Sequence, residues 1–284
     1  MRRLVFIISI LSWGLGAYTQ VPSDFAFSGE KEDSMSTLSI RPVHKPKEML
    51  RKIMKRLHSD LKQKHGARKY KVEATFWVDM FPSFFASCTL PVEGDNGLEI
   101  LGAPFELKRL VEDVEDFHYE GQDISGGDSI SLKKELLRSI AFSPTHASNY
   151  YSNGDHARSP FVRYEETTRW FKIDVYEIWY GSERSMYRVD MVKKKDRRLF
   201  RFGDSFFWRY DYTVSALFDC HTLRIIQIKG TMQSDEEKGN PIYYYKNYQI
   251  EYDEDGDAPV LNNISFVRKR SHTEKKCTVR RISQ

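Results

Sequence analysis

Apolar and polar residues alternate along most of the chain after residue 162, which is the pattern of half-buried strands. Phe171, Ile173 and Val175 share one parity, and polar residues begin the other. Glycine and aspartate mark the turns between successive segments, as at Asp255-Gly256. We expect seven or eight strands after residue 162, near 171–180, 187–191, 199–202, 206–212, 223–227, 242–252, 264–266 and 279–282.

The first half of the domain contains both the alternating pattern of strands and the three-to-four-residue spacing of helices. Residues 69–80 alternate as a strand, whereas residues 81–103 look irregular. Leucine and valine recur at helical spacing in 104–117 and 129–142, so we expect two amphipathic helices there. Serine, asparagine, glycine and histidine dominate residues 143–161, which is typical of a loop.

No helix separates the strands after residue 162, which disfavours a parallel sheet. Trp170-Phe171 and Trp179-Tyr180 place bulky side chains on both faces, so we expect cover on both sides. The predicted fold class is α+β: a curved antiparallel β-sheet, or half-barrel, with amphipathic helices packed on one side. The other side would meet a second sheet or a ligand.

A strongly basic segment precedes the domain. Residues 41–71 hold twelve Lys and Arg against only Glu48 and Asp60. Leucine, isoleucine and methionine recur at helical spacing from Leu50 to Leu61, so residues 41–68 read as a basic amphipathic helix. The helix either packs on the core with a solvated basic face, binds a membrane or polyanion, or contains dibasic processing sites. The candidate polyanion-binding residues are Arg51, Lys52, Lys55 and Arg56.

The first nineteen residues have the pattern of a secretory signal peptide. A basic start is followed by the apolar run 4–11 and by small residues, with cleavage expected after Ala17 or Thr19. The apolar run is shorter than the about 20 residues of a membrane-spanning helix. We therefore expect a secreted protein with a disordered segment at 20–40 and a β-rich domain at 69–284.

Composition excludes several classes. Of 284 residues, 14% are aromatic and only 16 are glycine, which excludes global disorder and collagen-like chains. A net charge of +4 does not point to nucleic acid, and we expect no nucleic-acid partner.

Three cysteines in an oxidising compartment allow one disulfide and leave one thiol, and three pairings are open. We favour Cys220–Cys277 because both lie in the strand-rich half. The role of Cys88 stays open. Asn263 begins an Asn-Ile-Ser sequon and is the candidate glycosylation site, although its apolar neighbours favour an occluded strand position.

No catalytic motif stands out. The sequence has no Gly-x-Ser-x-Gly elbow, phosphate-binding glycine loop or His-Glu-x-x-His motif. His146, Asp155 and His156 share one polar loop, but loop histidines are mostly solvated. We expect no enzyme, no cofactor and no metal.

One stretch of the chain resembles a known group. The segments YEIWYGSERSMYRVDMV (176–192), LFRFGDSFFWRYDYT (199–213), FDCHTLRII (218–226) and YQIEYDEDGDAPVLNNISF (248–266) follow one another. This order, over about residues 164–280, is similar to the secreted ependymin-related and LolA-like proteins. The chain departs from that group in having few cysteines, and only Cys220 occupies a matching place. The resemblance implies a half-barrel that binds lipids or fatty acyl chains.

The residue pattern and the resemblance lead to one functional hypothesis and one alternative. The hypothesis is a secreted binding protein that holds a hydrophobic small molecule or lipid in the half-barrel. The alternative is an extracellular interaction protein that binds polyanions or a membrane surface through residues 41–71. The candidate ligand-lining residues are Phe171, Ile173, Val175, Trp179, Phe206, Trp208, Tyr210 and Tyr244.

Overall fold

The computed structural model divides into two units, Met1–Ser36 and Thr37–Gln284, and everything described below lies in the second. The structure describes residues 38–60, 67–78, 81–92, 112–121, 130, 132–134, 136, 160–161, 163–194, 210–234, 244–255, 258–270 and 273–282. The expected signal peptide, 1–19, and most of the segment 20–40 lie outside the described residues.

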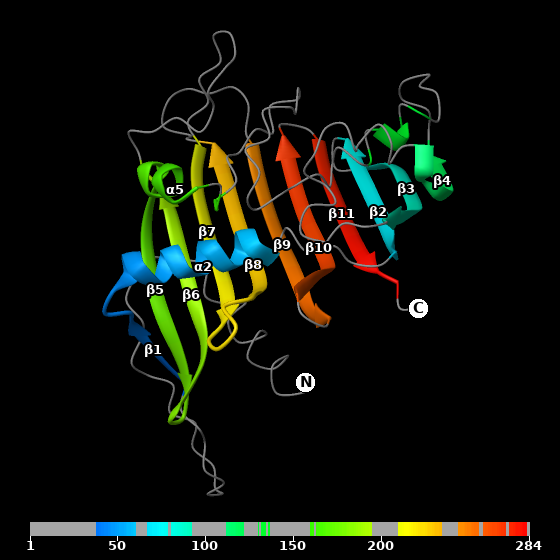
Figure 1. Ribbon diagram of the computed structural model, residues 1–284. Coiled ribbons are helices and arrows are strands. Elements are labelled where there is room, and N and C mark those ends of the chain that lie inside the picture. Colours follow the sequence, from blue (N-terminus) through cyan, green and yellow to red (C-terminus); the bar gives the residue numbers. More distant parts are fainter. Residues whose placement is uncertain are drawn as a thin grey trace, which may run out of the picture. The chain divides into compact units, whose positions relative to one another are not determined.

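Eleven strands among these residues form one antiparallel sheet, with β1 and β4 at its edges and no closure between them (Figure 1). The order across the sheet is β1-β5-β6-β7-β8-β9-β10-β11-β2-β3-β4. The strands are β1 (Leu38–Pro42), β2 (Arg68–Val78), β3 (Phe81–Val92), β4 (Glu115–Gly121), β5 (Phe171–Tyr180), β6 (Glu183–Lys193), β7 (Tyr210–Asp219), β8 (Ile225–Ser234), β9 (Tyr244–Asp255), β10 (Ala258–Arg270) and β11 (Thr273–Arg281).

Strands β5 to β11 form a meander in which each strand pairs with the next along the chain. The earlier strands extend this meander at both edges. Strand β1 pairs with β5, and β2 pairs with β11 from Val78 opposite Thr273 to Tyr70 opposite Arg281. The antiparallel α+β architecture predicted from the alternating pattern is therefore present.

Strand register gives the sheet one apolar face. A single row of directly paired, buried apolar side chains runs through nine strands, from β5 to β3. Because side chains alternate between faces with period two, this row fixes the face of every neighbouring residue. The row consists of Val175, Val189, Ala216, Ile228, Ile250, Ile264, Val279, Val72 and Cys88.

The opposite face of the sheet carries polar side chains next to this buried row. One residue position away, a row of paired polar side chains runs from β5 to β4. Some of its members bond to other polar side chains: Ser215 donates to Asp190 at 2.7 Å, for example. The expectation of two apolar faces holds only in part: Ile178, Met186 and Leu217 are buried on this second face, outside the main core, whereas the row along the middle of the sheet is polar. This polar row consists of Asp174, Asp190, Ser215, Lys229, Gln249, Ser265, Thr278, Glu73, Ser87 and His118.

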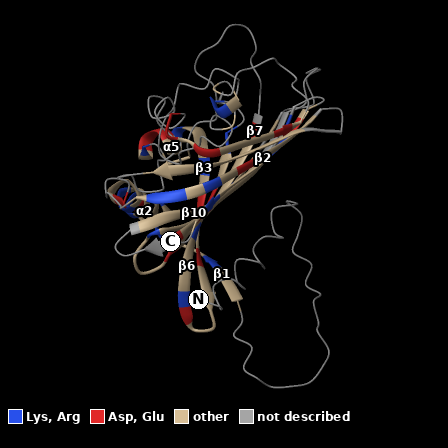
Figure 2. Ribbon diagram, turned by 90° about the vertical axis from the view of Figure 1, so that its right-hand side faces the viewer, with Lys and Arg blue, Asp and Glu red and all other residues tan. Residues whose placement is uncertain are grey.

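Helix α2 (Pro46–Asp60) lies across β5 to β8 on the apolar face (Figure 1). Its buried residues Leu50, Ile53, Met54 and Leu57 have the spacing of one helical stripe and join the core. The basic amphipathic helix predicted over residues 41–68 is confirmed for Pro46–Asp60 only. Residues 38–42 form β1, which includes the end of the segment expected to be disordered, and Arg68 begins β2. The short helix α5 (Tyr164–Trp170) leads directly into β5 and lies on the same side of the sheet as α2 (Figure 2).

Several expectations for the first half of the domain were wrong. Residues 81–92 form β3 rather than an irregular segment, and residues 115–117 belong to β4 rather than to a helix. The predicted helix 129–142 is described only at residues 130, 132–134 and 136, which are helical. Residues 164–170 are helical, whereas strands were expected from 162 onward.

Gly230 is required by the packing of Tyr248. The two residues are paired across β8 and β9, and a Cβ atom at Gly230 would overlap the tyrosine ring. Glycine within a strand often marks such a close approach. The ring thereby reaches Tyr212, and the two buried hydroxyl groups form a hydrogen bond of 2.6 Å.

Substituting Gly230→Ala should therefore lower the free energy of unfolding by about 3 kcal/mol, because overpacking displaces the ring and disturbs its hydrogen bond. Urea denaturation of the purified protein measures this. In a Tyr248→Ala background the same substitution should cost clearly less, because the clashing ring is gone. Equal costs in both backgrounds would contradict this account.

Candidate ligand-binding site

The predicted lining residues separate into three groups. Phe171, Ile173 and Val175 lie together on the apolar face of β5, and Phe171 meets Tyr212 edge-to-face with centroids 5.6 Å apart. Phe171 and Val175 are buried, whereas Ile173 is half-buried. The structure thus places these three in the core that α2 covers.

Trp179 lies apart from that group. It stands next to a register irregularity in which Ser185 of β6 has no partner, and its indole Nε1 donates to Glu177 at 3.1 Å. The guanidinium of Arg41 stands 5.0 Å from its ring. Trp179 is therefore held by polar neighbours near the C-terminal end of β5.

The remaining four lining residues lie wholly or partly outside the described part of the chain. Tyr210 and Tyr244 begin β7 and β9, and only their backbone positions are described. Phe206 and Trp208 lie outside the described residues.

Buried tyrosines were not anticipated by the sequence. Tyr212 and Tyr248 are both buried, and burial raises the pKa of each phenol above its ordinary value. Tyr70 lies on the same face, where burial raises its pKa to about 12. Such phenols stay neutral at physiological pH, and their hydroxyl groups are polar atoms on an otherwise apolar face. The nearest sequence signal is the small residue Gly230 within a run of strand residues.

An aromatic cluster continues the apolar face beyond α2. Phe76 of β2 stacks on Phe84 of β3 with centroids 3.9 Å apart, and Phe84 meets Tyr119 of β4 at 5.5 Å. All three are half-buried. The ammonium of Lys275 stands 4.3 Å from the centroid of Phe76. This aromatic cluster (Phe76, Phe84 and Tyr119) gives the apolar face partly accessible rings at the β4 edge.

The basic residues of α2 have two different environments. Arg51, Lys52 and Lys55 are exposed. Arg56 instead forms an ion pair with the fully buried carboxylate of Asp60, with Nε and Oδ1 2.9 Å apart. Three of the four predicted polyanion-binding residues are therefore directed to solvent, and the fourth is engaged within the fold.

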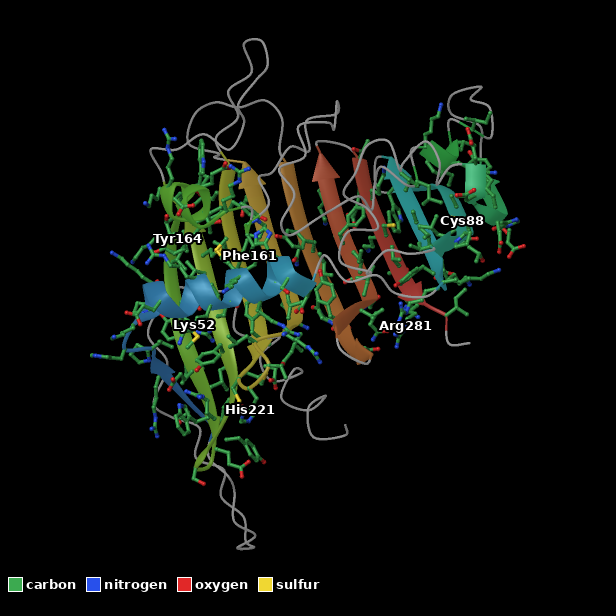
Figure 3. All side chains as sticks on the ribbon, viewed as in Figure 1. Lys52, Cys88, Phe161, Tyr164, His221 and Arg281 are labelled. Carbon is green, nitrogen blue, oxygen red and sulfur yellow. The ribbon has the colours of Figure 1, made fainter. Side chains whose placement is uncertain are left out.

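An open depression of about 390 Å³ lies between α2 and the start of α5. Arg51, Met54, Lys55, His58, Arg163 and Tyr164 line it. The guanidinium of Arg51 stacks 4.3 Å above the ring of Tyr164. Figure 3 shows Tyr164 and Phe161 beside α2, and Nε2 of His58 donates to the carbonyl of Phe161 at 3.0 Å. Sequence reasoning missed Arg163 and Tyr164 because it assigned this region to strands.

The expected Cys220–Cys277 disulfide is not formed. All three cysteines are free and buried. Cys220 directly follows β7, and Cys277 lies in β11, four strands away and hence at about 19 Å. A disulfide needs Cα atoms within about 7 Å. Burial raises the pKa of the Cys88 thiol to about 12, which disfavours thiolate chemistry there.

Asn263 lies in the middle of β10 and pairs with both β9 and β11. Its side chain is half-buried on the polar face, 3.5 Å from a carboxylate oxygen of Glu251. Glycosylation at this position stays a prediction.

Within the described residues, no group of three or more histidine, cysteine, aspartate or glutamate side chains has the arrangement of a metal site. The polar loop with His146, Asp155 and His156 lies outside them. No described helix has the length and apolar character needed to span a membrane.

The carboxylate of Asp60 makes the packing of α2 dependent on pH. Burial raises its pKa above the ordinary value of 3.8, and the charge of Arg56 opposes this without cancelling it. The folded state therefore binds the Asp60 proton more tightly than the unfolded state. The resulting stabilisation is present at acidic pH and is lost as the pH rises through the raised pKa.

Replacing Asp60 with asparagine should remove this dependence. Relative to Asp60→Asn, the wild-type free energy of unfolding should decrease as the pH rises above 3.8 toward 7. Urea denaturation of both proteins at several pH values gives the difference, in which the other carboxylates cancel. Parallel profiles across this range would show that Asp60 does not titrate in the way described.

No family model, curated protein or solved structure matches the chain. The resemblance to ependymin-related and LolA-like proteins therefore stays a prediction from the sequence.

Proposed function

We propose that this protein is a secreted, non-enzymatic binding protein that holds a hydrophobic small molecule or lipid against the apolar face of its sheet. In this proposal the open sheet curves into a half-barrel around the ligand. The proposal assigns no catalysis, cofactor or metal. Secretion follows from the signal-peptide pattern of residues 1–19.

The observation that supports the proposal best is the extent of the apolar face. The buried row spans nine strands, whereas α2 has only 15 residues and covers β5 to β8 (Figure 1). A helix of that length measures about 22 Å. Nine strands spaced about 4.8 Å apart span about 38 Å. Helix α2 is thus too short to cover the whole face, and the helical residues described between 130 and 136 pack near its β3–β4 end, where Leu136 joins the core and Lys133 stands over Phe117.

The aromatic cluster is the preferred contact for the ligand. Phe76, Phe84 and Tyr119 lie on the apolar face outside the part that α2 covers, and they remain half-buried. Ligand pockets are usually lined by apolar and aromatic side chains with a few polar groups. The ammonium of Lys275, next to Phe76, provides a polar group at this position.

A polyanion- or membrane-binding function is the second candidate, and one observation favours it. Lys47, Arg51 and Lys55 follow one another at four-residue intervals, so they form one exposed basic line along α2, with Lys52 beside it. Affinity through such a line would fall steeply as salt is added, because exposed charges are screened. Binding on the apolar face would change little with salt.

Binding of the neutral fluorescent probe N-phenyl-1-naphthylamine tests the apolar-ligand proposal. We expect saturable binding to the delipidated secreted protein, and about fivefold or greater weakening in Phe84→Ala, because part of an aromatic contact surface is lost. Tyr180→Ala is the matched control, because Tyr180 is an exposed aromatic residue of β5 on the other face. Fluorescence titration at low and high salt measures both variants.

Two further readouts keep this test decisive. Thermal unfolding establishes that Phe84→Ala remains folded under the titration conditions. Native mass spectrometry with organic extraction of the untreated protein searches for a co-purifying lipid. Absence of both saturable probe binding and a lipid mass would overturn the proposal.

A further inference from the structure

The depression between α2 and α5 concentrates positive charge in one place. Two of its lining residues, Arg51 and Lys55, stand one helical turn apart on α2. Arg163 adds a third cation from the residue before α5. Like charges at this spacing repel one another and destabilise the helix by themselves.

The chain does not neutralise these charges within its described part. Ion pairs occur at both ends of α2, where Lys45 meets Glu48 at 3.3 Å and Arg56 meets Asp60. Between them, no carboxylate of a described residue forms an ion pair with Arg51, Lys55 or Arg163. Glu165 and Glu166 follow Tyr164 in sequence, but neither lines the depression. Three cations thus converge on a space that an anion would fill.

The depression is also organised before any ligand arrives. The guanidinium of Arg51 is held on the ring of Tyr164, which in turn packs against the core. A stacked guanidinium keeps its N–H edge available for two parallel hydrogen bonds to an oxyanion. The bond from His58 to the Phe161 carbonyl ties α2 to the segment before α5, so His58 is a positioning residue.

We propose that this depression is a binding site for a single oxyanion group of the phosphate, sulfate or carboxylate class. Arg51 supplies the bidentate donor, and Lys55 and Arg163 supply charge. The site is local: Lys47 and Lys52 are exposed on the same helix but do not line it. This separates it from diffuse attraction of a polyanion to the whole basic face.

The oxyanion has two possible sources, a free anion or the head group of an amphiphile. Met54 connects the depression with the apolar face, because it lines the depression and belongs to the buried core. An amphiphile could therefore place its charged end here. Inorganic phosphate, dodecyl phosphate and dodecanol distinguish the sources. Phosphate binding does not depend on the function proposed above, so the two proposals fail separately.

Isothermal titration of the full secreted protein with inorganic phosphate and with dodecyl phosphate tests the site. We expect saturable binding that weakens about tenfold or more in Arg51→Gln and in Lys55→Gln, because each loses a charged hydrogen bond. Lys52→Gln and Lys47→Gln are the matched controls and should bind like the wild type. Affinity should fall with added salt.

The comparison of ligands then assigns the source. Tighter binding of dodecyl phosphate than of both phosphate and dodecanol supports a head group, whereas equal binding of the two phosphates supports a free oxyanion. Thermal unfolding of the same variants at the wild-type temperature shows that they remain folded, whether or not the protein binds naphthylamine. The proposal is overturned if neither phosphate binds saturably, or if Lys52→Gln weakens binding as much as Arg51→Gln.

Discussion

The whole structure depends on the register that aligns apolar residues across the sheet. Val175 of β5 and Cys88 of β3 are far apart in sequence and in space, yet they end the same buried row. A slip of one residue between any two strands would bring a polar row into the core on one side of the slip. Burial on one face therefore specifies every pairing between them, and it leaves α2 only one surface on which to pack its stripe.

The elements that could be predicted are those whose structure is determined by a local sequence pattern. The strands of the meander were recognisable because alternation such as Tyr187-Arg188-Val189-Asp190 is a local pattern. Strand β3 was missed because Pro82 and Pro91 near its ends resemble loop residues, although the positions between them alternate. Strand β4 begins inside a stretch whose leucine and valine residues have helical spacing, and pairing with β3 makes it a strand.

In the candidate site, too, some residues follow from a local sequence pattern and others from tertiary contacts. Arg51 and Lys55 were found because their helix has a clear stripe, which fixes the exposed side. Arg163 and Tyr164 reach them only through the tertiary contact of α5 with α2. The Cys220–Cys277 pairing was wrong for a related reason: nearness in a strand-rich segment says little about which strands are neighbours, and β7 and β11 are not.

The order of strands has a consequence for how the chain reaches this state. Segments synthesised early form both margins of the sheet, and the later meander lies between them. The segment from α5 to the last strand would by itself present two bare margins, at β5 and β11, with unpaired backbone groups ready to join another chain. The early strands thus cover the edges of the meander. Strands β1 and β2 can pair with β5 and β11 only after those strands, more than a hundred residues later in the sequence, have been synthesised. Such distant pairings slow folding and prolong the exposure of unpaired strands.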